Sequence, residues 1–267
     1  MELSSFRHGR QQKIIKAHCA IGGEHLAQSV NIASRIMVAL DFSNRDAAEV
    51  LVKQLAGIPC YLKIGIELFY AAGPEFILQL KQQGYSIFLD LKLHDIPNTV
   101  KGAAASITRL GVDMFNVHAS GGKQMMQAAA AGVQEGLESN PGLQKPIVIA
   151  VTQLTSTNRQ VMNEEIGIPG EVADSVMRYA VLAKQSGLDG VVSSPWEVPA
   201  LKAQLGSDFL TVTPGIRPAG SDSADQSRIM TPREAFKNGT DYIVIGRPIT
   251  KHEHPRKALE SIIEELM

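Results

Sequence analysis

Charged side chains stand within or directly after two short apolar segments of the sequence. Lys63 lies inside the first segment, Asp90 and Lys92 close the second, and Asp95 lies just beyond it. Alternate residues of a strand share one face, so Asp90 and Lys92 are expected to point the same way. A buried charge is tolerated only when it is paired and hydrogen-bonded. The spacing therefore predicts an alternating array of opposite charges around one site.

Glycine and arginine occur together after two later apolar segments. Gly215 and Arg217 follow one segment, and Gly246 and Arg247 follow the next. Glycine lets the backbone approach an anion closely, and a guanidinium group can bind two phosphate oxygens at once. One such pair alone would indicate a surface turn, but two in succession predict a phosphate site. The long polar stretch 219–230 between them is predicted to be a mobile lid.

Eight short apolar, β-branched segments alternate with helical patterns from residue 36 onward. Such segments are typical of parallel strands buried on both faces, and eight units in about 230 residues predict a (β/α)8 TIM barrel of the α/β class. The alternative is an open doubly wound sheet, but Asp41 and Phe42 stand where its glycine-rich dinucleotide turn would be. The predicted strands are 36–41, 61–65, 86–91, 114–118, 147–152, 190–193, 209–213 and 242–245, and the predicted helices are 47–55, 75–83, 99–110, 123–136, 172–186, 197–204, 232–238 and 256–266.

The predicted barrel places the charged residues together at one end. Active sites of such barrels lie at the carboxyl ends of the strands, where both the charged array and the glycine–arginine loops fall. A salt-bridge network that only holds the barrel floor is the alternative interpretation of the array. Barrel interiors are dominated by branched apolar side chains, which favours a catalytic role for charges at this end.

Composition excludes several other classes of protein. The chain has 267 residues, 44% hydrophobic and 20% charged, with a formal net charge of −1. This balance argues against a nucleic-acid-binding protein, and no apolar run approaches the length of a membrane span. Cys19 and Cys60 form no disulfide framework or metal motif, which favours a cytoplasmic protein. Residues 1–35 are predicted to be an N-terminal extension, and residues 36–267 a single barrel domain.

One segment carries a specific family resemblance. Residues 90–99 read DLKLHDIPNT, and the sequence also contains VALD at 38–41, YLKIG at 61–65, VTQLTS at 151–156, PGIRP at 214–218 and IGRP at 245–248. Together these motifs resemble the orotidine 5′-monophosphate decarboxylase family, in particular its bacterial branch. The resemblance covers about residue 36 to the end of the chain and leaves the N-terminal extension outside.

The resemblance implies a reaction and a set of residues. Members of this family convert orotidine 5′-monophosphate to UMP in pyrimidine biosynthesis through a C6 carbanion, without metal, flavin or other cofactor. It implies that Lys92 protonates C6, that Asp90 lies against the substrate carboxylate, and that Lys63 orients Asp90 and the ribose. Asp95 would enter the site of a partner subunit, so the resemblance implies a homodimer. The implied substrate-binding residues are Asp41, Lys63, Asp90, Thr99, Thr155, Arg217, Gln226, Gly246 and Arg247.

Three alternatives remain open from the sequence. His94 and His118 could form a metal pair, although no carboxylate-rich ligand set accompanies them, and no metal site is predicted. Related phosphate-binding barrels, the Mg²⁺-dependent sugar-phosphate decarboxylases and aldolases, share the Asp-x-Lys-x-x-Asp pattern but not the continuation from Ile96 to Thr99. The chain could also be a nucleotide-binding relative that has lost catalysis, which the presence of all four charged residues disfavours.

Overall fold

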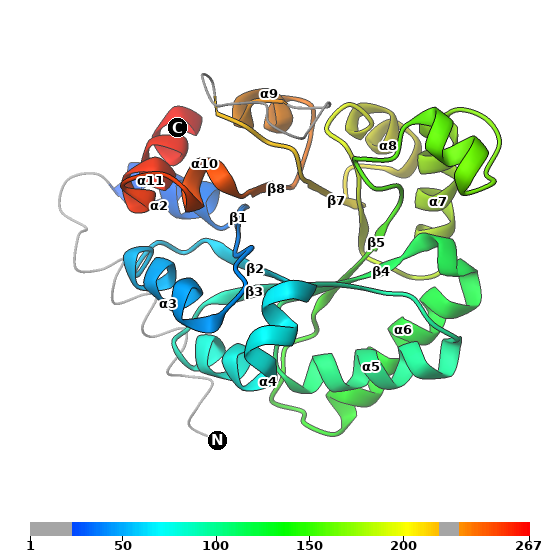
Figure 1. The fold of residues 1–267 in the computed structure, drawn as a ribbon, viewed down its shortest axis with the longest axis horizontal. Coiled ribbons are helices and arrows are strands. Elements are labelled where there is room, and N and C mark those ends of the chain that lie inside the picture. The colour runs from blue at the N-terminus through cyan, green and yellow to red at the C-terminus, as the bar shows by residue number, and fades with distance from the viewer. Residues whose placement is uncertain (1–22, 219–229) are drawn as a thin grey trace.

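Eight parallel strands form a closed barrel in the computed structural model, which describes residues 23–218 and 230–267 (Figure 1). Each strand pairs with its neighbours in sequence, and β8 closes the barrel against β1. The predicted fold class is confirmed. The strands are β1 (Ile36–Ala39), β2 (Tyr61–Gly65), β3 (Ser86–Leu93), β4 (Met114–His118), β5 (Ile147–Val151), β6 (Gly190–Val192), β7 (Leu210–Thr213) and β8 (Tyr242–Ile245).

Helices surround the barrel on its outside. A 3₁₀ turn, η1 (Ala119–Gly121), follows β4, and a π turn, η2 (Val161–Glu165), lies in the loop after β5. The helices are α2 (Gly23–Ala33), α3 (Arg45–Gln54), α4 (Ile66–Gln82), α5 (Pro97–Arg109), α6 (Gly122–Glu138), α7 (Val172–Gln185), α8 (Val198–Leu205), α9 (Pro232–Lys237), α10 (Arg247–Thr250) and α11 (Pro255–Leu266). Within the described ranges, no helix has the length and apolar character that crossing a bilayer requires.

Helix α4 differs from its prediction in a physically simple way. It starts directly after β2 and breaks at Gly73, whose φ is +72°, before Pro74 begins the second half. Glycine adopts this left-handed conformation readily, and proline suits the first turn of a helix. The predicted helix 75–83 covers only the second half, because the two residues interrupt the helical pattern in the sequence.

Two apolar cores hold the barrel. The larger one lies between the strands and the surrounding helices, and the smaller one fills the barrel interior. Tyr61 and Tyr242 meet edge to face next to the inner core, with ring centroids 5.7 Å apart. The inner core gives the barrel a packed floor below its carboxyl end. Its buried members are Met37, Ala39, Phe88, Met114, Ile149, Val212 and Val244.

A short sequence repeat at the amino-terminal end of the barrel was not predicted from the sequence. A Gly-x-Asp tripeptide precedes each of β4, β6 and β8, and its carboxylate accepts the backbone N–H of the preceding strand at 2.7–2.8 Å. A lysine pairs with each carboxylate from outside the barrel. These Asp–Lys clamps satisfy backbone donors where the strands begin. The aspartates, with their backbone donors and lysines, are Asp113 with Ile87 and Lys81, Asp189 with Val148 and Lys145, and Asp241 with Thr211 and Lys202.

Part of the predicted N-terminal extension packs on the barrel. Ile32 and Ala33 of α2 belong to the outer core, and Arg35 lies 4.2 Å from the ring centroid of Phe236. The Arg35 guanidinium also donates to the backbone carbonyls of Thr240 and Asp241. The division into residues 1–35 and 36–267 stays a prediction, and residues 1–22 lie outside the described ranges.

Candidate active site

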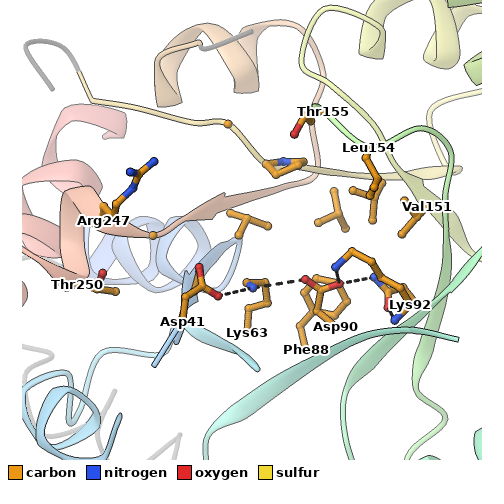
Figure 2. Close-up of a pocket in the computed structure, with 18 of the residues that line it drawn as sticks. Asp41, Lys63, Phe88, Asp90, Lys92, Val151, Leu154, Thr155, Arg247 and Thr250 are labelled. Carbon is orange, nitrogen blue, oxygen red and sulfur yellow. Dashed lines mark hydrogen bonds and ion pairs between the residues drawn. The ribbon is translucent and has the colours of Figure 1, made fainter. Parts of the chain in front are cut away.

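A cavity of about 600 Å³ opens at the carboxyl end of the barrel (Figure 2). Its volume lies in the range of small-molecule sites. Side chains from most strand ends line it, so the closed barrel brings together residues that are far apart in sequence. The predicted site residues in its lining are Asp41, Lys63, Asp90, Lys92, Thr155, Arg217, Gly246 and Arg247.

Four of these residues form a continuous row of alternating charge (Figure 2). The Lys63 ammonium lies 2.9 Å from Oδ1 of Asp41 and 3.4 Å from Oδ2 of Asp90. The Lys92 ammonium lies 2.6 Å from Oδ1 of Asp90. The side chains of Lys63 and Asp90 are only 11% and 12% exposed, whereas that of Asp41 is 64% exposed. Three members of the predicted array, Lys63, Asp90 and Lys92, are therefore brought together, and the most buried charges lie in the middle of the row. Asp41, and not Asp95, completes the row.

The row keeps its two buried members ionised. Burial alone raises the pKa of Asp90, but the charges of Lys63 and Lys92 and hydrogen bonds from Lys92 and Asn116 outweigh it and lower that pKa. Burial alone lowers the pKa of Lys63, but Asp90 and Asp41 outweigh it and raise that pKa. Mutual pairing thus maintains a buried carboxylate and a buried ammonium at neutral pH.

The backbone at Lys92 departs from regular strand geometry. Pairing between β3 and β4 shifts register between Leu89 and Leu93, and Lys92 has a φ of +53°. A non-glycine residue in this left-handed region costs about 1–2 kcal/mol. Asp90 and Lys92 both face the cavity as expected, but plain strand alternation does not account for it. The bulge in β3 aims Lys92.

Asn116 of β4 is a buried site residue that was not predicted from the sequence. It is 1% exposed, and its amide donates to Asp90 Oδ1 at 2.7 Å. Its side-chain oxygen accepts the backbone N–H of Lys92 at 2.8 Å. An amide in the middle of an apolar strand was the available signal, because buried polar groups need partners. Gln153, Thr250 and Lys251 also line the cavity without having been predicted.

The opposite part of the cavity carries the glycine–arginine loops. Gly215 has a φ of +82°, and Arg217 is buried with Nη1 donating to the carbonyl of Ile216 at 3.0 Å. Arg247 begins α10 directly after Gly246. Arg217 and Arg247 are therefore both among the residues that line the cavity. Gln226 and the predicted lid, apart from Met230 at its end, lie outside the described residues.

Asp95 and Thr99 are not brought to this cavity. Both are exposed and lie outside the cavity lining. The Asp95 carboxylate accepts the backbone N–H of Ile96 at 2.6 Å, and Thr99 lies in the first turn of α5. The structure of one chain therefore separates these two residues from the other predicted site residues.

The rings of His94 and His118 lie near each other, with centroids 5.5 Å apart. Burial lowers the pKa of His118, and the charges of His94 and Lys92 lower it further, while Asp90 acts in the opposite direction. In the described part of the chain, no three His, Cys, Asp or Glu side chains are grouped as metal ligands.

Comparison with known proteins agrees with the geometry. Residues 34–262 match the model of the "Orotidine 5'-phosphate decarboxylase / HUMPS family". The chain belongs to this family. Relatives named orotidine 5′-phosphate decarboxylase, from Bacillus cereus strain AH820 and Bacillus anthracis strain CDC 684 / NRRL 3495, are each 50% identical over 234 residues, which is 88% of this chain and 98% of theirs. The predicted family resemblance is confirmed.

Solved structures of similar proteins share the barrel. The orotidine 5′-phosphate decarboxylase of Lactobacillus acidophilus is 43% identical, with a TM-score of 0.78 over 86% of this chain and 98% of that protein. An uncharacterized conserved protein from Geobacillus kaustophilus is also 43% identical, with a TM-score of 0.77 over 87% of this chain and all of that protein. The orotidine 5′-phosphate decarboxylase / HUMPS family membership thus covers the barrel that positions the charged row.

Proposed function

We propose that this protein decarboxylates orotidine 5′-monophosphate to UMP, a step of pyrimidine biosynthesis, without a cofactor. The observation that carries the proposal is the charged row from Asp41 through Lys63 and Asp90 to Lys92, in a cavity that also presents Arg217 and Arg247. Relatives with half of their residues identical are named for this activity. We propose a cytoplasmic location, because a sequence with two cysteines and no disulfide or metal motif is typical of a reducing compartment.

The order of the strands orients the substrate. Strands β7, β8, β1, β2 and β3 are consecutive neighbours in the barrel. Arg217, Gly246 and Arg247, after β7 and β8, bind the phosphate, with Gln226 as a further ligand. Asp41 and Lys63 then contact the ribose, and the reacting carbon lies over Asp90 and Lys92. Thr155, after β5, contacts the far edge of the pyrimidine.

Electrostatics carry the proposed chemical step. The bond between C6 and the carboxylate breaks, CO₂ leaves, and the electron pair remains on C6. The Lys92 ammonium lies next to Asp90 and stabilises that negative charge before giving its proton to C6. Asp90 stays ionised because Lys63 and Lys92 pair with it, so it repels a substrate carboxylate placed beside it. Departure of CO₂ relieves this repulsion.

The proposed site is shared between two chains of a homodimer. Asp95 and Thr99 are exposed beside the mouth of their own barrel and are available to a neighbouring one. Ile66, Tyr70 and Ile96 are 52%, 85% and 67% exposed on the loops and helix starts after the paired strands β2 and β3. This apolar surface favours pairing of two barrels through their mouths. Asp95 then reaches the partner's charged row.

A direct assay tests the proposed reaction. Loss of orotidine 5′-monophosphate is followed by ultraviolet absorbance with and without excess metal chelator. We expect turnover that the chelator leaves unchanged. Loss of activity in chelator would favour a Mg²⁺-dependent sugar-phosphate enzyme. UMP binding without turnover would indicate a nucleotide-binding protein that has lost catalysis.

Mixing two inactive variants tests the shared site. A Lys92→Ala chain paired with an Asp95→Ala chain places both defects in one site and leaves the other intact. We expect about half of the sites in mixed dimers to work once subunits exchange. Each variant alone is the control. A mixture that stays inactive after demonstrated exchange would assign Asp95 to its own chain's site.

A further inference from the structure

Asn116 links the two charged residues of β3 through one side chain. Its oxygen accepts the backbone N–H of Lys92 at 2.8 Å, and its amide nitrogen donates to Asp90 Oδ1 at 2.7 Å. The same Oδ1 accepts the Lys92 ammonium at 2.6 Å. The residue is almost completely buried inside the barrel. A single amide from β4 therefore contacts both the main chain of one catalytic candidate and the carboxylate of the other.

The bulge in β3 explains why an amide is needed there. Leu89 pairs with Phe115 and Leu93 with Val117, so β3 advances four residues where β4 advances two. Within the bulge, Lys92 adopts its left-handed conformation and loses the regular ladder. Its N–H finds an acceptor in the Asn116 side chain instead. The conformation that aims Lys92 thus depends on a partner from the neighbouring strand.

The amide also sets the orientation of the Asp90 carboxylate. Because Asn116 and Lys92 both donate to Oδ1, the other oxygen, Oδ2, is directed toward Lys63 at 3.4 Å. Without the amide, the carboxylate can rotate between its two lysines, and the Lys92 backbone can relax toward a right-handed conformation. Either change moves the groups that face the substrate.

We propose that Asn116 is a positioning residue for decarboxylation, holding Lys92 and Asp90 together in the arrangement that the reaction needs. The inference rests on the proposed function, since it assumes that both residues act at C6. A misplacement of about 1 Å can reduce turnover about 10²-fold, even when binding is retained. The role therefore predicts a loss in kcat with little change in KM.

Two substitutions separate the functions of the amide. Asn116→Leu keeps the branched shape and the number of side-chain heavy atoms but removes both hydrogen bonds. Asn116→Asp keeps an acceptor for the Lys92 N–H but replaces the donor to Asp90 with a carboxyl group. Thr108→Val is the matched control, because it removes a buried hydrogen bond, to the carbonyl of Ala104 in α5, away from the cavity. For each variant, kcat and KM for orotidine 5′-monophosphate, UMP affinity and thermal unfolding are measured.

We expect Asn116→Leu to lower kcat about 10²-fold, while KM and UMP affinity stay within about threefold because Arg217 and Arg247 are unchanged. Thr108→Val should leave kcat within about twofold of the unaltered protein. A folded Asn116→Leu protein whose kcat falls less than about threefold would overturn the inference. So would a loss of kcat in Thr108→Val equal to that in Asn116→Leu.

The Asn116→Asp protein adds a pH test that a purely structural role would not pass. When it is ionised, the new carboxylate repels Asp90. As the pH falls, it takes up a proton and can donate its O–H to Asp90 as the amide did. The ratio of unaltered to variant kcat should therefore shrink with falling pH. The other charged and titratable groups around Asp90 are Lys63 and Lys92, which pair with it, Asp41, which pairs with Lys63, and His118. They are common to both proteins, which are compared at each pH.

The outcomes distinguish this inference from the proposed function. If Asn116→Leu fails to fold, the inference is tested by the ratio of unaltered to Asn116→Asp kcat. A ratio that does not change with pH overturns the inference. If the unaltered protein turns over, Lys92→Ala does not, and Asn116→Leu remains fully active, only the positioning role fails. If the unaltered protein forms no UMP, the proposed function fails and the positioning role fails with it.

Discussion

The two ends of this barrel use the same pair of residue types, aspartate and lysine, with opposite results. At the amino-terminal end, the carboxylates of Asp113, Asp189 and Asp241 accept backbone N–H groups as well as a lysine. At the carboxyl end, Asp90 accepts from the side chains of Lys92 and Asn116 and borders an open cavity. A carboxylate that accepts a strand's backbone N–H and a lysine contributes to stability, whereas one that faces a cavity can act on a ligand.

The ion pairs of Lys202 and Lys92 allow the two ends of the barrel to be compared directly. Each ammonium lies 2.6 Å from an aspartate oxygen, Lys202 from Asp241 and Lys92 from Asp90. Their side chains are 16% and 34% exposed. Distance and residue type are therefore matched, whereas exposure and the position along the barrel differ. The following predictions test whether that position separates stability from catalysis.

Replacing Lys92 should have the largest effect on activity. Lys92→Ala removes the proposed proton donor and one of the charges that hold Asp90 ionised, so we expect turnover to fall at least about 10³-fold with the barrel still folded. Steady-state kinetics measure the turnover, and circular dichroism shows whether the barrel is folded. Lys202→Ala is the matched control and should keep its turnover. A Lys92→Ala protein with more than a tenth of normal activity would disprove the assignment.

Replacing Arg247 tests the phosphate end of the same cavity. Arg247→Ala should weaken UMP binding about 10- to 10²-fold, because charge-assisted hydrogen bonds to the phosphate are lost. Uridine, which carries no phosphate, should bind both proteins about equally. Calorimetric titration of both ligands provides the measurement. Equal losses for the nucleotide and the nucleoside would show that Arg247 has a structural role.

Replacing Asp241 should change stability and not catalysis. Asp241→Ala leaves the Thr211 backbone N–H and the Lys202 ammonium without their carboxylate, so we expect a loss of about 1–3 kcal/mol in the free energy of unfolding. Denaturant unfolding measures it, and kcat is expected to be unchanged. Asp189→Ala should have a smaller effect, because its partner Lys145 is 61% exposed and lies 3.4 Å away. A drop in kcat for Asp241→Ala would contradict the conclusion that the amino-terminal end contributes to stability and not to catalysis.

The acid limit of activity should reflect the lowered pKa of Asp90. Its carboxylate contributes to stability and catalysis above its ordinary pKa, and this contribution is lost only as the pH falls through the lowered value. Removing the charge of Lys63 by Lys63→Met raises the pKa of Asp90, so the acid limb of kcat should move to higher pH. The pH dependence of kcat in both proteins tests this. If the acid limb of the kcat profile lies at the same pH in both proteins, Lys63 does not lower the pKa of Asp90.

The residue pattern predicted the barrel because its strands are buried on both faces and are nearly continuous apolar runs. The same reasoning placed Lys63, Asp90 and Lys92 at one end, since charges inside such runs have few tolerable positions. It did not find the Asp–Lys clamps, because a Gly-x-Asp tripeptide is too short to stand out before the strands that it precedes are known. It also predicted only half of α4, where Gly73 and Pro74 interrupt the pattern.

The sequence by itself determined the eightfold alternation, the placement of Lys63, Asp90 and Lys92 at one end, and the glycine–arginine loops, because local apolar patterns and residue chemistry encode them. The tertiary structure decided what the charges touch. Asn116 meets Lys92 and Asp90 only because β4 pairs with a bulged β3, and the φ of +53° at Lys92 depends on that pairing. These contacts join residues that are 24 and 26 positions apart in the sequence. They arise from the packing of neighbouring strands, which no local pattern specifies.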